Sequence, residues 1–202
     1  MTNTSTILDQ LKVSTRSQHE ALEEVARSEK LGSGQLSAKE YAALIKANYW
    51  AHRYLESTLE RNFNVVSVLP DWPKRKKASL LLKELEQLGL TAEELDDAVP
   101  QKNRPDLKYE AHLWGVLYVM EGSTLGGAVI AKALKKNEQL ANYMPPQFYG
   151  AYAEETGAMW KNFRNQLAGH INSEEDEQEA IQAAKETFDF YSECFKQAFL
   201  QM

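Results

Sequence analysis

Histidines are the residues of this 202-residue chain best suited to bind a metal, and there are four of them. A dinuclear iron centre in a helical bundle needs a glutamate three residues before a histidine on two helices. The residues at that position here are Arg16, Tyr49, Tyr109 and Leu167. The sequence also has no HExxH pair, no cysteine–histidine zinc spacing and no GxSxG serine motif. These patterns exclude the carboxylate-bridged iron site and the common zinc sites, and they argue against a serine nucleophile.

His19 differs from the other histidines because it falls on an apolar helix stripe. The stripe repeats every three or four residues and consists of Leu8, Leu11, Thr15, His19 and Leu22. Lys12 and Arg16 lie on the same side of that helix, displaced by roughly 20° to 60° from His19. An apolar wall, an imidazole and two cations suit a flat apolar ligand with a central metal and carboxylates at one edge. Taken alone, the helix favours the other interpretation, a core histidine beside a solvated basic face.

Glycines gather on one predicted helix face in the second half of the chain. Gly115, Gly122 and Gly126 are spaced i, i+7 and i+11, and Gly127 is adjacent. Each glycine inside a helix destabilises it by roughly 0.5–1 kcal/mol relative to alanine. Two explanations stay open, which are close packing of another helix and close approach of the backbone to a flat ligand. Ser123 on the same surface offers a hydroxyl group that can order water.

The elements that position these residues are predicted to be helices almost throughout, because apolar residues recur every three to four positions. Capping boxes mark two helix starts, Ser37 to Glu40 and Thr91 to Glu94. The expected helices cover residues 7–26, 38–63, 71–89, a short stretch after 91, 107–136, 151–167 and 174–199. We therefore expect an all-α, multi-helical fold with one domain over residues 1–202, of which residues 1–6 form a flexible N-terminus.

Composition narrows the function classes. The net charge is −6, which argues against nucleic-acid binding because such proteins carry a basic footprint. No apolar run is long enough for a membrane helix, and the N-terminus lacks a secretory signal. The single cysteine, Cys194, cannot form an internal disulfide, so we expect a reducing, cytoplasmic location and an inert packed thiol. We interpret the run Lys74-Arg75-Lys76-Lys77 as a solvated helix face, with docking of an acidic redox partner as the alternative.

Two segments of the chain together resemble the heme oxygenases. The first is Lys12-Val-Ser-Thr-Arg16-Ser-Gln-His19, and the second is Tyr118-Val-Met-Glu-Gly122-Ser-Thr-Leu-Gly126-Gly127. The Glu-Gly-Ser-Thr-Leu-Gly-Gly form is most similar to the bacterial members that supply biliverdin to bacteriophytochromes. The order and character of the expected helices are similar to the family over most of the chain.

The resemblance implies a heme site with a role for each matching residue. The residues expected around the heme are His19, Lys12, Arg16, Tyr118, Gly122, Gly126, Gly127 and Lys161. His19 matches the ligand of the heme iron, and Gly122 and Gly126 match the glycines that lie directly over the heme. Lys12, Arg16 and Lys161 match positions that pair with the heme propionates. Ser123 stands where animal members carry an aspartate that organises distal water, so the expected catalytic set is Ser123, Gly122 and Gly126.

The implied reaction is cleavage of heme by O2 and supplied electrons to biliverdin, carbon monoxide and iron. The electrons must come from an external donor, a ferredoxin, a flavodoxin or a reductase, and a bacteriophytochrome is the implied recipient of biliverdin. No nucleic acid or membrane partner is expected. Two alternatives stay open. A non-catalytic heme carrier is favoured by Ser123, which holds no fixed charge, and a thiaminase-like helical hydrolase would need Cys194 in a pocket with a carboxylate.

Overall fold

The computed structural model describes residues 6–91, 95, 99–143 and 145–202, and all regular secondary structure in those ranges is helical. This confirms the predicted all-α class. The helices are α1 (Ile7–Ser14), α2 (Arg16–Val25), α3 (Ser28–Ser33), α4 (Ala38–Asn62), α5 (Val65–Val68), α6 (Trp72–Arg75), α7 (Ala78–Gln87), α9 (Glu110–Gly122), α10 (Gly127–Leu134), α11 (Thr156–His170) and α12 (Glu174–Leu200), with 3-10 helices η1 (Glu138–Tyr143) and η2 (Ala153–Glu155). The short helix expected after Thr91 lies outside the described residues, apart from position 95, and so do residues 1–5.

The two longest helices begin where the sequence predicts. The Ser37 hydroxyl accepts a hydrogen bond from the Glu40 amide at 3.2 Å, and the Glu40 carboxylate accepts one from the Ser37 amide at 3.0 Å. This reciprocal pair satisfies amides that have no partner in the first turn of α4. Ser173 caps α12 in a similar way, since its hydroxyl accepts from the Asp176 amide at 3.1 Å.

Three predicted helices are each broken in two, so the expected continuous helices over 7–26, 71–89 and 107–136 are wrong. The Thr15 hydroxyl donates to the Leu11 carbonyl at 2.7 Å, a bond that bends helices, and it separates α1 from α2. The Lys77 amide donates to the Glu56 carboxylate at 2.7 Å, which separates α6 from α7. The third break lies between Gly122 and Gly127, where α9 ends and α10 begins.

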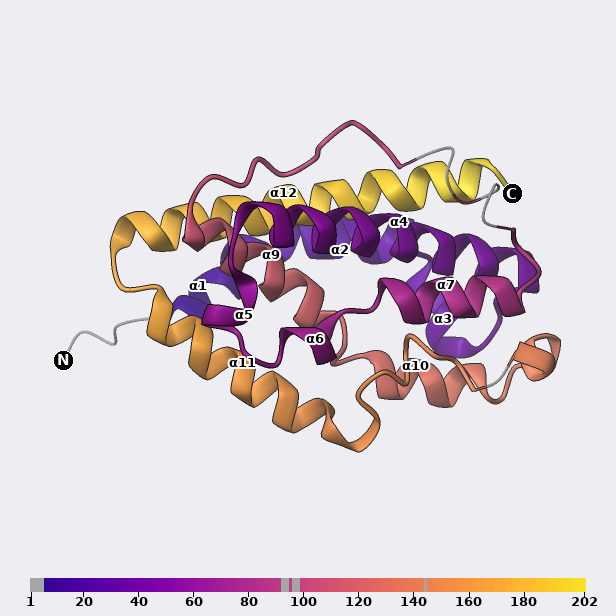
Figure 1. The fold of residues 1–202 in the computed structure, drawn as a ribbon. Coiled ribbons are helices and arrows are strands. Elements are labelled where there is room, and N and C mark those ends of the chain that lie inside the picture. Colours follow the sequence, from indigo (N-terminus) through magenta and orange to yellow (C-terminus); the bar gives the residue numbers. More distant parts are fainter. Residues whose placement is uncertain (1–5, 92–94, 96–98, 144) are drawn as a thin grey trace.

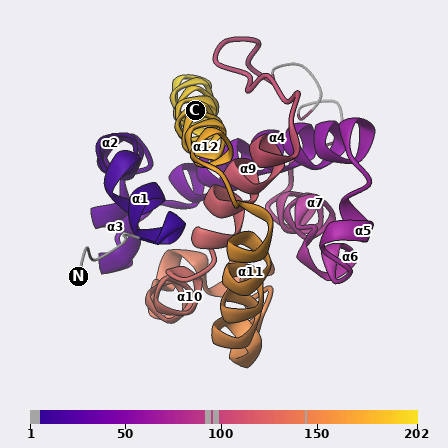
Figure 2. The same cartoon turned by 90° about the vertical axis from the view of Figure 1, so that its left-hand side faces the viewer.

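Helix α12 is the central support of the molecule, because it packs against α9, α4 and α2. The long axis of α12 runs along one edge of the bundle in Figure 1. In the end-on view of Figure 2, α1, α2 and α3 lie on one side of α9 and α12, whereas α5, α6 and α7 lie on the other, and α10 and α11 lie below. The elements that carry the two expected halves of the site are thus held by one helix.

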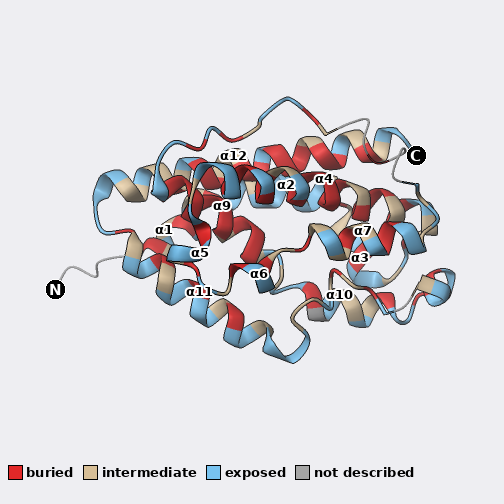
Figure 3. Ribbon diagram, viewed as in Figure 1, coloured by how far each residue is buried: buried red, intermediate tan, exposed pale blue. Residues whose placement is uncertain are grey.

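The core lies between α4, α9 and α12, and buried residues line the facing sides of these helices in Figure 3. It contains the fully buried indole rings of Trp50, Trp72 and Trp114. Helix α2 contributes no buried residue. None of the described helices is long and apolar enough to cross a membrane.

Candidate heme site

The imidazole of His19 lies on the surface of α2 rather than in a buried stripe. Leu11 and Thr15 are fully buried as expected, but the His19 side chain is 56% exposed. One edge of its ring meets the ring of Phe188 on α12, with centroids 5.7 Å apart. The prediction of a continuous buried stripe is therefore wrong beyond Thr15. The reason is that α2 packs against α12 by one edge, which leaves the His19 face of α2 open.

A carboxylate one turn later orients the His19 ring. Nδ1 of His19 lies 3.6 Å from a carboxylate oxygen of Glu23. A carboxylate beside one ring nitrogen favours the proton on that nitrogen and leaves the lone pair of the other free to bind a metal. Among the described residues, none forms a hydrogen bond with Nε2 of His19. Glu23 is a residue that the sequence analysis missed, although its i, i+4 spacing from His19 was a signal for this contact.

The three expected propionate-binding cations are all exposed. The Arg16 guanidinium donates to Glu20 at 2.7 Å, and both side chains are largely exposed. In the part of the chain that the structure describes, Lys12 and Lys161 form no ion pair. Lys12 is on α1 and Lys161 on α11, and these two helices pack against each other. The structure therefore places the cations at the surface, where a charged ligand edge can reach them.

The glycines of the second motif divide into two groups by what surrounds them. A Cβ atom at Gly115 would lie 2.2 Å from the Ala180 carbonyl oxygen, and one at Gly127 would lie 2.8 Å from the Tyr149 carbonyl oxygen. Close backbone packing explains both glycines. At Gly122 the nearest atom would be Cη2 of Trp160, 4.0 Å away, and at Gly126 it would be Cδ1 of Ile130, 3.7 Å away. Packing gives no reason for glycine at these two positions.

Between Gly122 and Gly127 the chain turns, and we call residues 122–126 the distal segment. Helix α9 ends at Gly122 and α10 starts at Gly127, so the bare positions lie at a bend rather than along one helix. Ser123 is exposed, and its hydroxyl donates to the Met120 carbonyl at 2.7 Å. Because its proton is used in that bond, the Ser123 oxygen is left as an acceptor for water.

The two halves of the site meet at Thr15 and Tyr118. Burial raises the pKa of Tyr118, and a hydrogen bond with Thr15 partly offsets this. His19 follows Thr15 by one helical turn, and Gly122 follows Tyr118 by one turn, so each lies on the same face as the contact residue before it. From this contact α2 and α9 run toward the same end of the molecule (Figure 1). His19 and Gly122 therefore lie at about the same distance along their helices from the contact between Thr15 and Tyr118.

This arrangement fits a heme. An exposed imidazole could hold the iron, and the two glycines whose Cβ positions are not crowded could lie against a flat ligand. Lys12 and Arg16, two turns and one turn before His19, could pair with carboxylates at the ligand edge.

The lysine–arginine run is not a solvated helix face, so that interpretation is wrong. Arg75 is fully buried and Lys77 is 1% exposed. Both pair with the buried carboxylate of Glu121, the residue before Gly122. Lys76 pairs with Glu60 at 2.8 Å. The run alternates between interior and surface because α6 ends at Arg75. Four adjacent exposed cations are therefore not available for docking of an acidic redox partner.

Cys194 is a packed core thiol, as expected. It is fully buried, and burial raises the pKa of its thiol. A nucleophilic cysteine needs the opposite, an accessible thiol with a lowered pKa. The thiaminase-like alternative therefore has no reactive thiol to use.

Comparison with known proteins identifies the family. The heme oxygenase family model matches residues 5–197. A heme oxygenase of Xanthomonas campestris pv. campestris (strain 8004) is 34% identical over 167 residues, which cover 81% of this chain and 93% of that protein. The NO- and CO-bound heme oxygenase of Neisseria meningitidis superposes with a TM-score of 0.70 at 24% identity, covering 96% of this chain and 92% of that one. The heme oxygenase of Leptospira interrogans gives a TM-score of 0.70 at 19% identity, covering 96% and 100%, so the fold is shared with both. The chain belongs to the heme oxygenase family.

Proposed function

We propose that this heme oxygenase binds heme between α2 and the distal segment, with His19 as the iron ligand and O2 on the opposite face. The family establishes that the chain is a heme-degrading enzyme. The observation that supports this location is the pair of uncrowded glycines, Gly122 at the end of α9 and Gly126 in the bend after it, one turn or more beyond the contact of Tyr118 with Thr15. Heme and O2 together supply the oxidising chemistry, and the chain supplies binding, orientation and proton delivery.

On the proximal side, His19 binds the iron through Nε2 as a neutral imidazole. Glu23, 3.6 Å from Nδ1, and the Phe188 ring in edge contact with the imidazole would orient the ring so that Nε2 could hold the iron. Bound heme would supply the iron at which O2 reacts.

On the distal side, the chain acts by shape. Gly122 and Gly126 allow the backbone to approach the ligand within van der Waals distance, which a side chain would prevent. The steric effect of this backbone directs O2 toward the heme edge. The Ser123 oxygen accepts a hydrogen bond from water, and that water can donate in turn, so Ser123 serves as an anchor for proton delivery rather than as an acid.

At the heme edge, Lys12, Arg16 and Lys161 set the rotation of the heme by charge-assisted hydrogen bonds to the propionates. Arg16 exchanges its surface bond to Glu20 for a propionate, a change with little penalty because exposed ion pairs contribute little to stability. The rotation selects which heme carbon is cleaved. Tyr118 lines the inner edge beside Thr15.

Electrons come from an external donor, and we propose a ferredoxin, a flavodoxin or a reductase. We keep a bacteriophytochrome as the proposed recipient of biliverdin, on the form of the glycine motif alone. The single buried cysteine supports our proposal of a reducing, cytoplasmic location.

The iron ligand is tested by a heme titration. We expect the purified protein to give a sharp Soret band with hemin, and His19→Ala to weaken or abolish it, because the iron loses its protein ligand. His170→Ala is the matched control, since His170 pairs with Glu110 on another face. Added imidazole should restore the band in His19→Ala. An unchanged spectrum in His19→Ala would remove this histidine from the iron.

Turnover separates the oxygenase from a heme carrier on the same fold. We expect a reductant under air to convert the bound heme to biliverdin, because the open distal segment gives O2 access to the iron. Absorption spectra over time follow the loss of the Soret band and the rise of the biliverdin band. A stable complex that is never consumed would favour the carrier.

A further inference from the structure

The distal segment needs an anchor outside itself. Gly122 and Gly126 have no side chain that could hold the backbone in place, and no neighbouring atom of the described residues is packed tightly against them. Ser123 and Thr124 use their hydroxyl groups on carbonyls of the preceding turn, at Met120 and Glu121. Whatever fixes the position of this segment must therefore act at its two ends, Glu121 and Gly127.

At the first end, the Glu121 carboxylate is buried in a cluster of charged and hydrogen-bonding groups. One oxygen accepts from Arg75, and the other lies 3.3 Å from Nζ of Lys77. The hydroxyl group of Tyr152 lies 2.8 Å and 3.0 Å from the two oxygens. All oxygens of this carboxylate are thus occupied by groups from α6, from the residue before α7 and from the residue before η2.

The cluster holds two cations, Arg75 and Lys77, and more than one further carboxylate. Arg75 also donates two hydrogen bonds of 2.8 Å to Asp71. The buried Glu56 carboxylate accepts from the Lys77 amide at 2.7 Å. Burial disfavours the charged form of Arg75, but its bonds to Asp71 and Glu121 outweigh this and raise the pKa of the guanidinium. Burial lowers the pKa of Lys77. A buried ion pair of this kind is weak support for stability and better support for a fixed geometry.

At the second end, the backbone of the same neighbouring segment closes on Gly127. The Tyr149 carbonyl is so close that a Cβ atom at Gly127 would lie 2.8 Å from it. Tyr149 and Tyr152 belong to one stretch, residues 148–152, which we call the clamp segment. The clamp segment is itself held by α7, because the Phe148 amide donates to the buried carboxylate of Glu84 at 2.8 Å.

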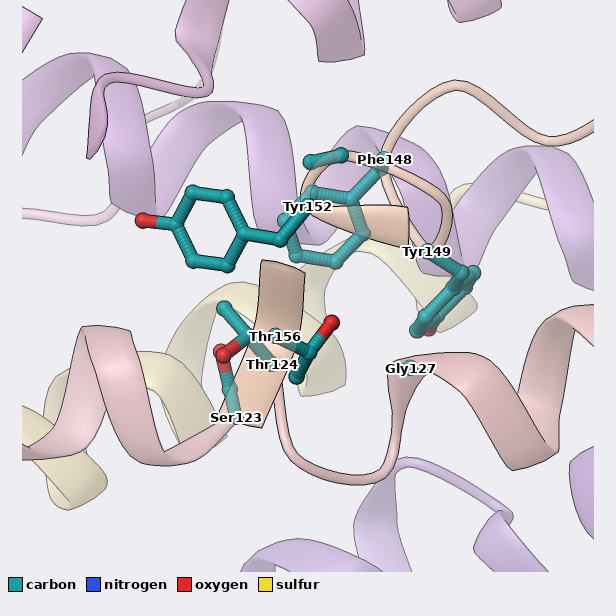
Figure 4. A pocket seen from close by; sticks show the side chains of 8 residues that line it. Ser123, Thr124, Gly127, Phe148, Tyr149, Tyr152 and Thr156 are labelled. Carbon is teal, nitrogen blue, oxygen red and sulfur yellow. The ribbon is translucent and has the colours of Figure 1, made fainter. Parts of the chain in front are cut away.

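Between the two ends lies a small cavity of about 10 Å³. Its lining consists of Ser123, Thr124, Gly127, Phe148, Tyr149, Ala151, Tyr152 and Thr156. Figure 4 shows the side chains of the clamp segment on one side of this cavity and those of the distal segment on the other. The contacts that join the two segments at the ends of this cavity are those of Glu121 with Tyr152 and of Gly127 with the Tyr149 backbone.

We propose that Tyr152 and Glu121 are positioning residues that fix the distal segment in place through the clamp segment. The Tyr152 hydroxyl donates to Glu121 and accepts from Lys77 Nζ at 2.9 Å, so it joins the end of α9 to the residue that precedes α7. The other end of the distal segment rests on the Tyr149 backbone. The effect on heme binding rests on the proposed function of Gly122 and Gly126. The positioning of the distal segment does not depend on it.

Hydrogen exchange of the heme-free chain tests the clamp. Tyr152→Phe removes one hydroxyl group, and Glu121→Gln removes one charge while keeping the side-chain shape. In both variants we expect the amides of residues 119–130 to exchange roughly tenfold faster or more, as follows from losing a hydrogen bond to a charged group. The amides of α4 and α12 should exchange as in the wild type.

The matched control is Glu193→Gln, which removes another ion-paired carboxylate, one on α12 whose partners are Lys102 and Lys196. It should leave residues 119–130 unchanged. Wild-type exchange of these residues in Tyr152→Phe overturns the proposal, and so does acceleration spread evenly over all peptides in both variants. Tyr152→Phe keeps every charge, so the test remains available if Glu121→Gln does not fold.

Hemin binding tests whether the clamp acts on the heme site. In Tyr152→Phe we expect a shifted Soret maximum and faster heme dissociation, with Glu193→Gln unchanged. Faster exchange with an unchanged spectrum and unchanged dissociation would overturn the link to heme. The exchange experiment contains no heme, so a failure of the heme-site proposal and a failure of the clamp are distinguishable.

Discussion

At the scale of single residues, the chemistry of this site depends on where a proton or a charge is held. Glu23 lies 3.6 Å from Nδ1 of His19, and the Tyr152 hydroxyl donates to Glu121 while it accepts from Lys77. In both cases a second residue determines which atom of the first is free. The nearest neighbours of a functional side chain therefore matter as much as its type.

Glu40 provides a titration that can be measured without heme. A hydrogen bond from the Ser37 amide and one from Lys30 lower the pKa of Glu40 from 4.5 to about 2. Because the folded pKa lies below the unfolded one, the stabilisation is complete above the unfolded pKa and is lost as the pH falls toward 2. We expect Glu40→Gln to lower the free energy of unfolding at pH 7 by on the order of 2–3 kcal/mol.

Urea unfolding of both proteins between pH 7 and pH 2 measures this effect. The difference between wild type and Glu40→Gln should stay constant down to about pH 5 and then shrink, because Glu40 becomes progressively protonated as the pH falls toward its folded pKa of about 2. A difference that does not depend on pH would show that the loss comes from packing rather than from the charge of Glu40.

At the scale of elements, the glycines show what sequence could and could not predict. The spacing of Gly115, Gly122 and Gly126 indicated a special helix face; close packing is confirmed for Gly115, and approach to a flat ligand stays a proposal for Gly122 and Gly126. Gly115 serves packing against α12, whereas Gly122 and Gly126 have no packing reason. One sequence cannot separate these cases, because the answer depends on what a distant segment places against each position.

The helix breaks were missed for the same reason. The apolar period continues through Thr15, Lys77 and Ser123, so it predicts uninterrupted helices there. Each break is made by a hydrogen bond or a turn that the period does not encode, such as the bond from the Lys77 amide to Glu56. As a result, the sequence did not predict that Arg75 and Lys77 are buried, nor that they meet Glu121 beside the clamp segment.

Alanine substitutions at two glycines of α9 should have opposite effects. Gly115→Ala should lower the free energy of unfolding by about 3 kcal/mol or more, because its Cβ atom collides with the backbone of α12 and the two helices must separate. Gly122→Ala should leave the heme-free protein unchanged or more stable by about 0.4–1 kcal/mol. It should also weaken heme binding at least tenfold, because the added methyl group occupies the ligand surface.

Urea unfolding and hemin titration of both variants measure these effects. Equal loss of stability in the two would mean that Gly122 is packed as tightly as Gly115. Unchanged hemin affinity in Gly122→Ala would remove this glycine from the heme surface.

At the scale of the whole molecule, the proposed heme site lies between α2 and the end of α9, and both of these helices pack against α12. Helix α2 has an open outer face and packs on α12, and α9 packs on another part of α12. The motif pair in the sequence predicted that the two arms face one ligand. It did not predict that α12 is their common support, because only the assembled bundle shows which helix is central (Figure 2).

Heme should therefore stabilise the whole fold by tying these arms together. A ligand at 100 times its Kd stabilises the folded state by about 2.7 kcal/mol, and for a protein of this size that corresponds to a rise in Tm of roughly 5–10 °C. We expect this rise in the wild type and in His170→Ala, and a much smaller one in His19→Ala and Gly122→Leu, measured by scanning calorimetry with and without hemin. His19→Ala removes the proposed iron ligand, and Gly122→Leu blocks the proposed ligand surface on the other side of the heme. A full rise in both would mean that heme binds elsewhere on the molecule, since neither α2 nor the distal segment would then be needed to hold it.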